Sequence, residues 1–259
     1  MRVLVNTVGV LLALAVCAAP TLRAQDSHAS VASAVERLAE AGAAARTLGP
    51  IDEALALIDR ALAAAPTDSV FLHYKGYAFY RKGSLEMALG HRSDAARSLD
   101  SAAASLRASS ATLAWADTYA LLGAAIGERI GVSGNPFSAM RNGPKSNAAL
   151  DRAAKLGPAN PRVFLLRGMG AFYKPRMFGG GADKAIQELE HALKLFETDS
   201  AASPLPTWGR GEAYAFLGLV RASEGRRDDA IAAYERALSF TPLQVLVRDS
   251  LLPSVRGRR

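Results

Sequence analysis

Three consecutive glycines, Gly179 to Gly181, precede a segment with helical periodicity, a combination that could bind phosphate. A phosphate loop of the Walker type needs four residues between its first glycine and a Gly-Lys-Ser/Thr, so that successive backbone amides surround the phosphate. Here Lys184 follows Asp183, no Ser or Thr follows the lysine, and no strand signature precedes the loop. We therefore predict a turn between two helices, with an anion site at the helix start as the alternative.

This predicted turn makes three local demands. At least one of the glycines should have a positive φ, which glycine adopts without strain. Asp183 should cap the following helix, because a short acidic side chain accepts hydrogen bonds from free backbone amides. Met177 and Phe178 should fold the loop back onto the neighbouring helices as a hydrophobic plug.

Other side chains that could carry chemistry are sparse. The four histidines have no metal-ligand spacing, the single cysteine is Cys17, and no Ser-His-Asp arrangement can be assembled from the sequence. The adjacent acids Asp228 and Asp229 suit the positive end of a helix dipole. We predict no catalytic, cofactor-binding or metal site, and so a non-enzymatic protein. The histidines are His28, His73, His91 and His191.

The N-terminus has the pattern of a secretory signal. Arg2 is followed by the apolar run Val8 to Ala19 and by the small residue Ala24, and the run is short for a bilayer span. We expect cleavage after Ala24, export to the periplasm and no transmembrane helix in the mature chain. The alternative is a lipoprotein acylated at Cys17, although Val16 replaces the small residue usual before such a cysteine.

The chain is moderately basic. It has 31 Lys and Arg against 24 Asp and Glu, a net charge of +7 that falls to +5 when Arg2 and Arg23 leave with the signal. The charges are interleaved except in the tail, residues 256–259, which we interpret as a solvated end. Because nucleic-acid binding needs a basic face with interleaved aromatics, this pattern argues against it.

The stretch from Gly211 to Gln244 has the periodicity of two short amphipathic helices around a turn at Gly225. Small residues recur where two helices approach closely, large ones fill the spaces between them, and Pro242 ends the second helix. The stretch resembles a tetratricopeptide repeat, with Arg221 at the one signature place where an aromatic is usual. The matching residues are Tyr214, Leu217, Gly218, Gly225, Ala230, Tyr234, Ala237 and Pro242.

The same spacing recurs upstream, with insertions in the second, third and fourth units. The resemblance implies an all-α fold, an α-solenoid of about five helix-turn-helix repeats with a C-terminal capping helix. Ser203 to Trp208 contains two prolines and should be a stiff linker. The predicted segments are a signal (1–24), a linker (25–34), repeats near 35–68, 69–109, 116–160, 161–197 and 211–244, and a capping helix with a basic tail (245–259).

The resemblance also implies a concave face built from the first helix of each repeat. Two repeats place aromatic and arginine side chains at the groove positions, where the other repeats have alanine at several matching places. We expect a groove for an extended peptide or helix that carries a carboxylate. The alternative is that these side chains pack beneath the insertions as core. The groove residues are His73, Tyr77, Tyr80, Arg81, Arg162, Met169, Phe172 and Tyr173.

These features predict an exported scaffold that binds a protein or peptide of the cell envelope. At least three of Tyr77, Tyr80, Arg81, Arg162 and Tyr173 should then be accessible to solvent, and arginine variants at the groove should leave the fold intact. The pattern "PRMFGGG" with its flanking residues also faintly resembles the periplasmic repeat components of tripartite solute transporters. That resemblance implies a small organic ligand or a transporter partner, with a pocket closed by the inserted loops.

Overall fold

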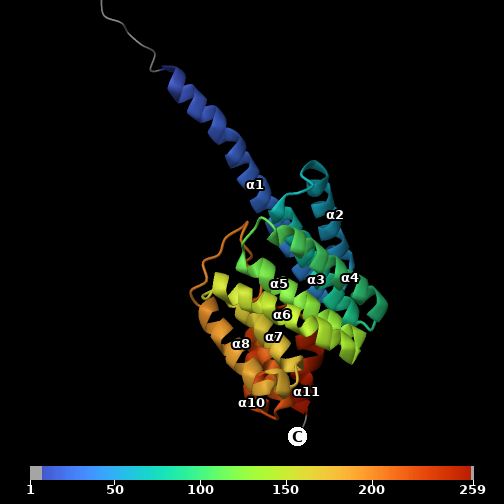
Figure 1. The fold of residues 1–259 in the computed structure, drawn as a ribbon. Helices are drawn as coiled ribbons and strands as arrows, with labels where there is room; N and C mark the ends of the chain where they lie inside the picture. Colours follow the sequence, from blue (N-terminus) through green and yellow to red (C-terminus); the bar gives the residue numbers. More distant parts are fainter. Residues whose placement is uncertain (1–7, 258–259) are drawn as a thin grey trace, which may run out of the picture.

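The computed structural model describes the backbone of residues 8–257 and the side chains of residues 27–257. Within that range the chain forms helices and loops and no strand, which confirms the predicted all-α class. Five antiparallel helix pairs stack side by side and a short helical segment follows them (Figure 1). The pairs are α1 (Val8–Ala45) with α2 (Gly49–Ala64), α3 (Ser69–Ala88) with α4 (Arg92–Ser110), α5 (Ala116–Ser133) with α6 (Pro136–Leu156), α7 (Pro161–Tyr173) with α8 (Ala182–Phe196), and α9 (Arg210–Ser223) with α10 (Arg227–Phe240).

The structure describes only part of the N-terminal region for which we predicted a signal and a linker. The expected signal, with Ala24 and Cys17, includes residues 1–7, which lie outside the description, and the side chains of the remainder lie outside it as well. Residues 25–34, which we expected to form a linker, are helical and belong to α1. The first repeat therefore begins with a longer helix than its repeat frame requires.

The stack has two layers. The first helices of the pairs pack in sequence, α1 on α3, α3 on α5, α5 on α7 and α7 on α9, and form an inner layer. Each second helix packs mainly on its own partner and lies outside it. This arrangement is a solenoid, in which each repeat covers the apolar face of the one before it.

The two helices of a pair pack closely where a glycine of the first helix faces a large side chain of the second. A Cβ added at Gly168 of α7 would lie 2.7 Å from Cγ of Leu189 on α8, and one at Gly218 would lie 2.6 Å from the ring of Tyr234. Gly123 and Leu150 repeat the relationship in the third pair. Because the glycines have no side chain, the paired helices approach closely enough for the large residue to fill the space between them.

The insertions of the second and third repeats lengthen helices. The helices α3 and α6 contain 20 and 21 residues, and α9 and α10 contain 14 each. At 1.5 Å per residue, α6 is about 10 Å longer than α10. The additional turns of α6 precede and include Pro144, which lies inside the helix.

The C-terminal segment closes the open end of the stack, as predicted. A π-helical turn (η2, Val247–Leu251) leads into α11 (Leu252–Gly257). Val247, Leu252 and Val255 are buried against Ala230 and Tyr234 of the last repeat. This contact covers apolar surface that would otherwise face water.

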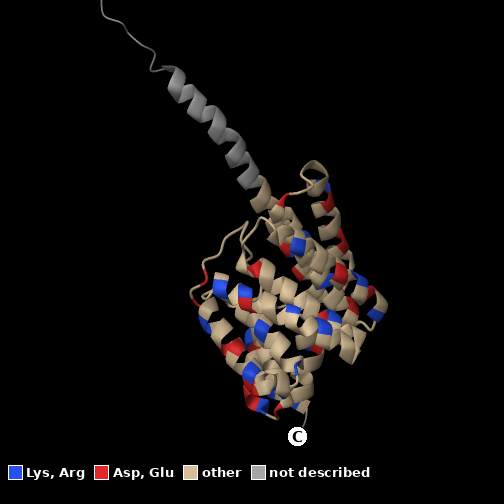
Figure 2. Cartoon of the chain, viewed as in Figure 1, with Lys and Arg blue, Asp and Glu red and all other residues tan. Residues whose placement is uncertain are grey.

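Basic and acidic side chains are interspersed over the helices, in agreement with the interleaved charges of the sequence (Figure 2). Within the part of the chain that the structure describes, no helix is both long enough and apolar enough to cross a membrane.

Candidate functional site

The predicted binding face is the inner layer, and local signals fix its two central helices. The Asp68 carboxylate accepts hydrogen bonds from the backbone amides of Val70 and Phe71, both at 3.0 Å, and so begins α3. The Asn160 side chain caps α7 in the same way, followed by Pro161 in the first turn. These starts fix the rotation of each helix and therefore the direction of the side chains one turn apart.

A non-helical segment lies across this inner face. Residues 199–209, between α8 and α9, form what we term the inner segment; the connection appears as the orange loop in Figure 1. The Ser203 hydroxyl donates to the Ala29 carbonyl at 2.7 Å, and the Tyr74 hydroxyl donates to the Pro204 carbonyl at 2.8 Å. The expected absence of helix at Ser203 to Trp208 is confirmed, but the inner segment packs on α1 and α3 and does not serve only as a linker.

The Glu36 carboxylate of α1 holds the end of the inner segment. It accepts hydrogen bonds from the Thr207 amide at 3.1 Å and the Thr207 hydroxyl at 2.5 Å, and the Tyr74 hydroxyl oxygen lies 3.3 Å away. Burial raises the pKa of Glu36, and the hydrogen bonds from Thr207 partly oppose that rise. The carboxylate is thus satisfied by the backbone and side chain of the inner segment.

Trp208 is the largest side chain of the inner segment, and it is buried. Its ring stacks on Tyr77, with centroids 5.4 Å apart and an interplanar angle of 24°. The Arg81 guanidinium lies 5.8 Å from the Trp208 ring and 5.7 Å from the Tyr77 ring. Gly209 follows with a φ of +113° and sits against Leu165, so a larger residue would be strained there.

Arg162 joins the inner segment to α5. Its Nε donates to Asp117 at 2.9 Å and its Nη1 donates to Asp199 at 2.8 Å. Asn160 donates to the second oxygen of Asp117 at 2.6 Å. Burial raises the pKa of Asp117 although Arg162 acts in the opposite direction. The cluster forms a buried ion-pair network in which the polar groups have specific partners.

Arg81 makes the equivalent link between the first and last repeats. It forms ion pairs with Glu40 of α1 and, at 2.6 Å, with Glu212 of α9. Tyr80 beside it donates to Glu128 at 2.8 Å. Burial raises the pKa values of Glu212 and Glu128. The inner face therefore carries a polar centre that spans repeats one, two, three and five.

The structure contradicts the expected accessibility of this face. Only Tyr173, of the five residues named for that test, is exposed, so the expectation of at least three is wrong. The physical cause is the inner segment together with the carboxylates of neighbouring helices, which pair with the arginines and tyrosines. The structure buries five of the predicted groove residues, namely His73, Tyr77, Tyr80, Arg81 and Arg162. Met169 and Phe172 are half-buried, and Tyr173 is exposed.

His73 illustrates the burial clearly. Its Nδ1 lies 2.9 Å from the Thr118 hydroxyl, and its ring meets Tyr74 and Trp115 edge-on. Burial lowers the pKa of His73 to about 3, so the side chain is neutral at physiological pH. In this conformation it packs in the core and has no access to a ligand.

One feature of the sequence could have indicated that the inner segment, which the prediction treated only as a linker, packs on the stack. The connection from α8 to α9 spans residues 197–209, which is long for a compact repeat, and it carries two prolines and a tryptophan. Long connections without secondary structure are often functional, and a tryptophan side chain buries a large apolar area when it packs. The pairing of Asp199 with Arg162 had no such signal, because the two residues are distant in sequence.

The glycine turn agrees with the prediction in its backbone and differs in its side chains. Gly179 and Gly181 have φ values of +80° and +108°, which confirms the turn. Asp183 makes no cap hydrogen bond and instead pairs with Arg176 at 3.5 Å, so the predicted cap is wrong. The hydrophobic plug is also wrong, because Met177 and Phe178 of the 3₁₀ turn η1 (Arg176–Phe178) are 82% and 66% exposed.

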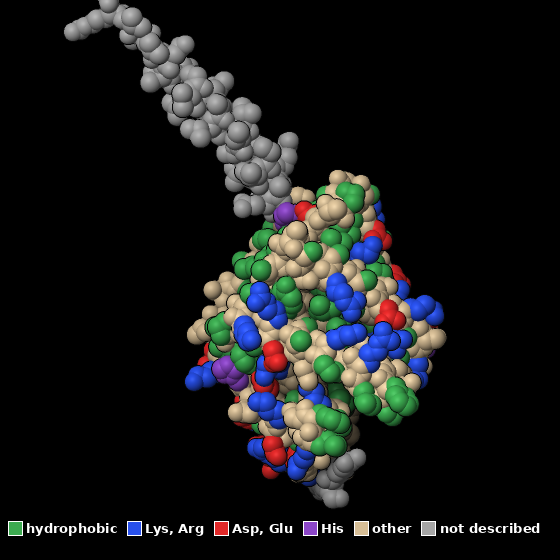
Figure 3. Space-filling model, in the orientation of Figure 1, with side chains coloured by type: hydrophobic (Ala, Val, Ile, Leu, Met, Phe, Trp, Pro, Cys, Tyr) green, Lys and Arg blue, Asp and Glu red, His purple; other side chains and the backbone are tan. Residues whose placement is uncertain are grey.

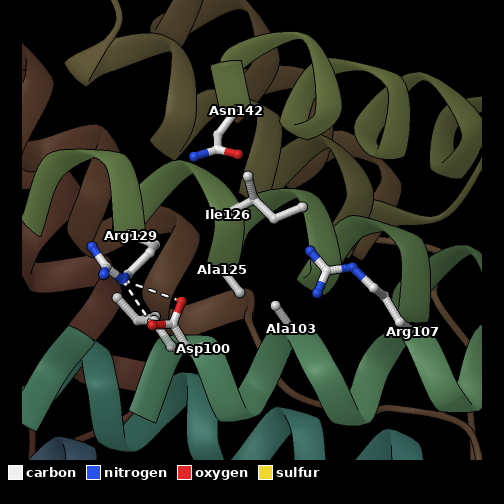
Figure 4. Close-up of a pocket in the computed structure, with 8 residues that line it drawn as sticks. Asp100, Ala103, Arg107, Ala125, Ile126, Arg129 and Asn142 are labelled. Atoms are coloured by element: carbon white, nitrogen blue, oxygen red, sulfur yellow. Dashed lines mark hydrogen bonds and ion pairs between the residues drawn. The ribbon is translucent and has the colours of Figure 1, made fainter. Parts of the chain in front are cut away.

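A shallow hollow lies on the outer side of the stack, between α4, α5 and α6 (Figure 4). It has a volume of about 170 Å³, and Asp100 on its wall pairs with Arg129 at 3.1 Å. Pockets for small organic ligands commonly enclose 300–1,000 Å³. This hollow is therefore a weak candidate for the small-ligand pocket that we considered as an alternative.

The described titratable side chains make specific pairwise contacts. Among residues 27–257 no three His, Cys, Asp or Glu side chains are placed to hold a metal ion. His28 pairs with Asp68 at 2.7 Å, and His191 meets Phe164 edge-on on the surface. The arrangement can hold a chain segment through ion pairs, hydrogen bonds and ring stacking.

Comparisons with known proteins agree with this geometry. Residues 211–242 match the sequence profile of the tetratricopeptide repeat. A tetratricopeptide-repeat protein from Thermus thermophilus, TTC0263, aligns over 81% of this chain and 92% of its own, with a TM-score of 0.57 and 23% identity. The HusA haemophore from Porphyromonas gingivalis aligns over 76% of this chain and 92% of its own, with a TM-score of 0.60 and 24% identity. No curated protein matches the chain.

The fold and the profile match define a helical-repeat protein. The chain carries a tetratricopeptide repeat at residues 211–242 and has the fold of tetratricopeptide-repeat proteins.

Proposed function

We propose that the protein is an exported, non-enzymatic scaffold that binds a peptide or protein partner of the cell envelope through its inner face. The observation that supports this proposal is how that face holds the inner segment. Arg162 binds the Asp199 carboxylate, Tyr77 stacks on Trp208, and Tyr74 binds the Pro204 carbonyl. A partner would bind there by replacing residues 199–209, and not by entering an open groove.

The contacts define the chemistry of such a partner. It is an extended segment with a carboxylate near one end and an aromatic side chain near the other, because Arg162 and Tyr77 bind these two groups in the inner segment. Arginine recognises carboxylates through paired hydrogen bonds, and aromatic stacking adds affinity. Export rests on the basic start, short apolar run and Ala24 of the sequence.

The test uses a labelled peptide with the sequence of residues 199–209, DSAASPLPTWG. A Trp208→Ser chain, whose own segment is weakened, should bind it in fluorescence anisotropy. The natural chain should bind it far more weakly, because its tethered segment competes at a high effective concentration. A control peptide with Ser and Asn in place of the tryptophan and the aspartate should not bind.

A second variant guards against loss of folding. Asp199→Asn with Thr207→Val removes polar anchors of the inner segment and keeps the tryptophan in place. If either variant keeps its helical circular dichroism and still does not bind the peptide, the inner face is not a segment-binding site. Where binding is seen, cross-linking of the same variant in an envelope extract, with the peptide as competitor, identifies the natural partner.

A further inference from the structure

An exposed apolar row lies on one edge of the solenoid, away from the inner face. All the first helices run toward this edge, so the turns into the second helices lie along it. Inserted residues of the third and fourth repeats lie along it, 134–145 mainly in the first part of α6 and 174–181 in the turn before α8. We term these residues the insertion edge. Its exposed apolar side chains are Phe137 (78%), Met140 (75%), Met177 (82%) and Phe178 (66%).

The two parts of the insertion edge belong to elements that contact each other. The Lys174 ammonium donates to Asn147 of α6 at 2.7 Å, which links the turn after α7 to the helix that carries Phe137 and Met140. Residues 137 and 140 are three positions apart in α6 and so share a helix face. Hydrophobic side chains gather at the lower right of Figure 3, where α6 begins.

The charges of the insertion edge have one sign. Residues 134–145 contain Arg141 and Lys145, residues 174–181 contain Lys174 and Arg176, and neither range contains an acid. Arg141, Lys145 and Arg176 are exposed, and only Arg176 among these three has an ion pair within the described chain, a long one to Asp183 just beyond the edge. The apolar side chains are therefore flanked by basic groups, of which Arg141 and Lys145 are exposed without an ion pair among the described residues.

We propose that the insertion edge docks on an anionic lipid bilayer surface. Phe and Met side chains would enter the interface while Arg and Lys meet the lipid phosphates, which is the composition of interfacial membrane-binding segments. The form of the edge favours a bilayer over a partner helix. The apolar side chains lie at the start of α6 and in the turn η1, and both of these positions are exposed, whereas an amphipathic helix needs an apolar groove.

The test places an environment-sensitive dye on the edge of the full chain. Met140→Cys is labelled in a Cys17→Ser background, since Cys17 is the only cysteine. Vesicles that contain phosphatidylglycerol should shift the emission to the blue and raise it several-fold, and phosphatidylcholine vesicles should not. Reversing two charges with Arg141→Glu and Arg176→Glu should weaken vesicle binding at least roughly tenfold, because each basic group near the surface contributes about fivefold.

The matched control is a dye at Ser239→Cys, which is exposed near the end of α10 at the opposite edge. It should not respond, because it lies away from the insertion edge. A response at 239 alone would overturn the proposal. Two responses of the dye at 140 in the absence of vesicles would also overturn it. A response to a higher concentration of the protein alone would indicate a second copy, and a response to an acidic amphipathic helical peptide would indicate a protein partner.

Discussion

Trp208 stacks on Tyr77 across 130 residues of sequence, with ring centroids 5.4 Å apart, and this contact places the inner segment against the second repeat. In a solenoid each repeat normally contacts only its neighbours. Here Trp208, with the Arg81–Glu212 ion pair at 2.6 Å, joins the far end of the stack to its beginning. The repeats therefore share contacts that an open array lacks.

We expect Trp208→Ala to lower the free energy of unfolding by about 3–5 kcal/mol, because it removes a buried aromatic side chain and leaves a cavity against Tyr77. Urea denaturation followed by circular dichroism measures the change. The control is Leu205→Ala on the same segment, where the side chain is 45% exposed, with an expected change within about 0.5 kcal/mol. Equal effects of the two variants would show that the inner segment is not packed as described.

Arg162→Met should destabilise the fold by about 3–5 kcal/mol, since it leaves the Asp117 carboxylate buried without its ion-pair partner. The burial of Arg162 reverses the expectation from the sequence that arginine variants here leave the fold intact. Adding Asp117→Asn removes the unpaired charge and should restore part of the loss. The exposed Arg97, replaced by Met, should change stability by less than about 1 kcal/mol. A small effect of Arg162→Met alone would indicate a hydrated site.

The extent of sequence-based prediction differs between the fold and the site. The repeat signature at Gly218, Tyr234 and Ala237 reflects local packing within one helix pair, so it could be recognised from spacing alone. The burial of Arg162 depends on Asp117 and Asp199, each about 40 residues away, and no local pattern encodes that meeting. The insertion at Phe137 was visible as an interruption of the repeat, but its continuation as helix depends on packing against α5.

The close approach of paired helices predicts opposite effects for two glycines of α7. Gly168→Ala should cost about 1–3 kcal/mol, because the added Cβ would lie 2.7 Å from Cγ of Leu189. Gly170→Ala should be neutral or stabilising by up to about 1 kcal/mol, since nothing lies within 4 Å of that Cβ and alanine favours helix. Thermal and urea unfolding of both variants make the comparison. The same sign at both positions would contradict the described pairing of α7 with α8.

The buried His73 predicts a specific acid sensitivity. Burial lowers its pKa to about 3, whereas in the unfolded chain the side chain should titrate near 6.5, the ordinary pKa of histidine. Below pH 6.5 His73 is therefore protonated in the unfolded state and neutral in the folded state. The free energy of unfolding falls as the pH falls toward 3. Between pH 7 and pH 5 this one group should remove about 2 kcal/mol.

The measurement compares the natural chain with His73→Gln and His73→Phe by urea denaturation at pH 7 and pH 5. Buried carboxyl groups such as Glu36 and Glu128 have raised pKa values and change stability in the opposite direction, but they are common to all three proteins and cancel in the difference. Both variants should lose about 2 kcal/mol less than the natural chain on acidification, whatever their stability at pH 7. If the free energy of unfolding falls by the same amount in the natural chain and in the variants, His73 is protonated in the folded state. Its site beside Thr118, Tyr74 and Trp115 would then be accessible to water.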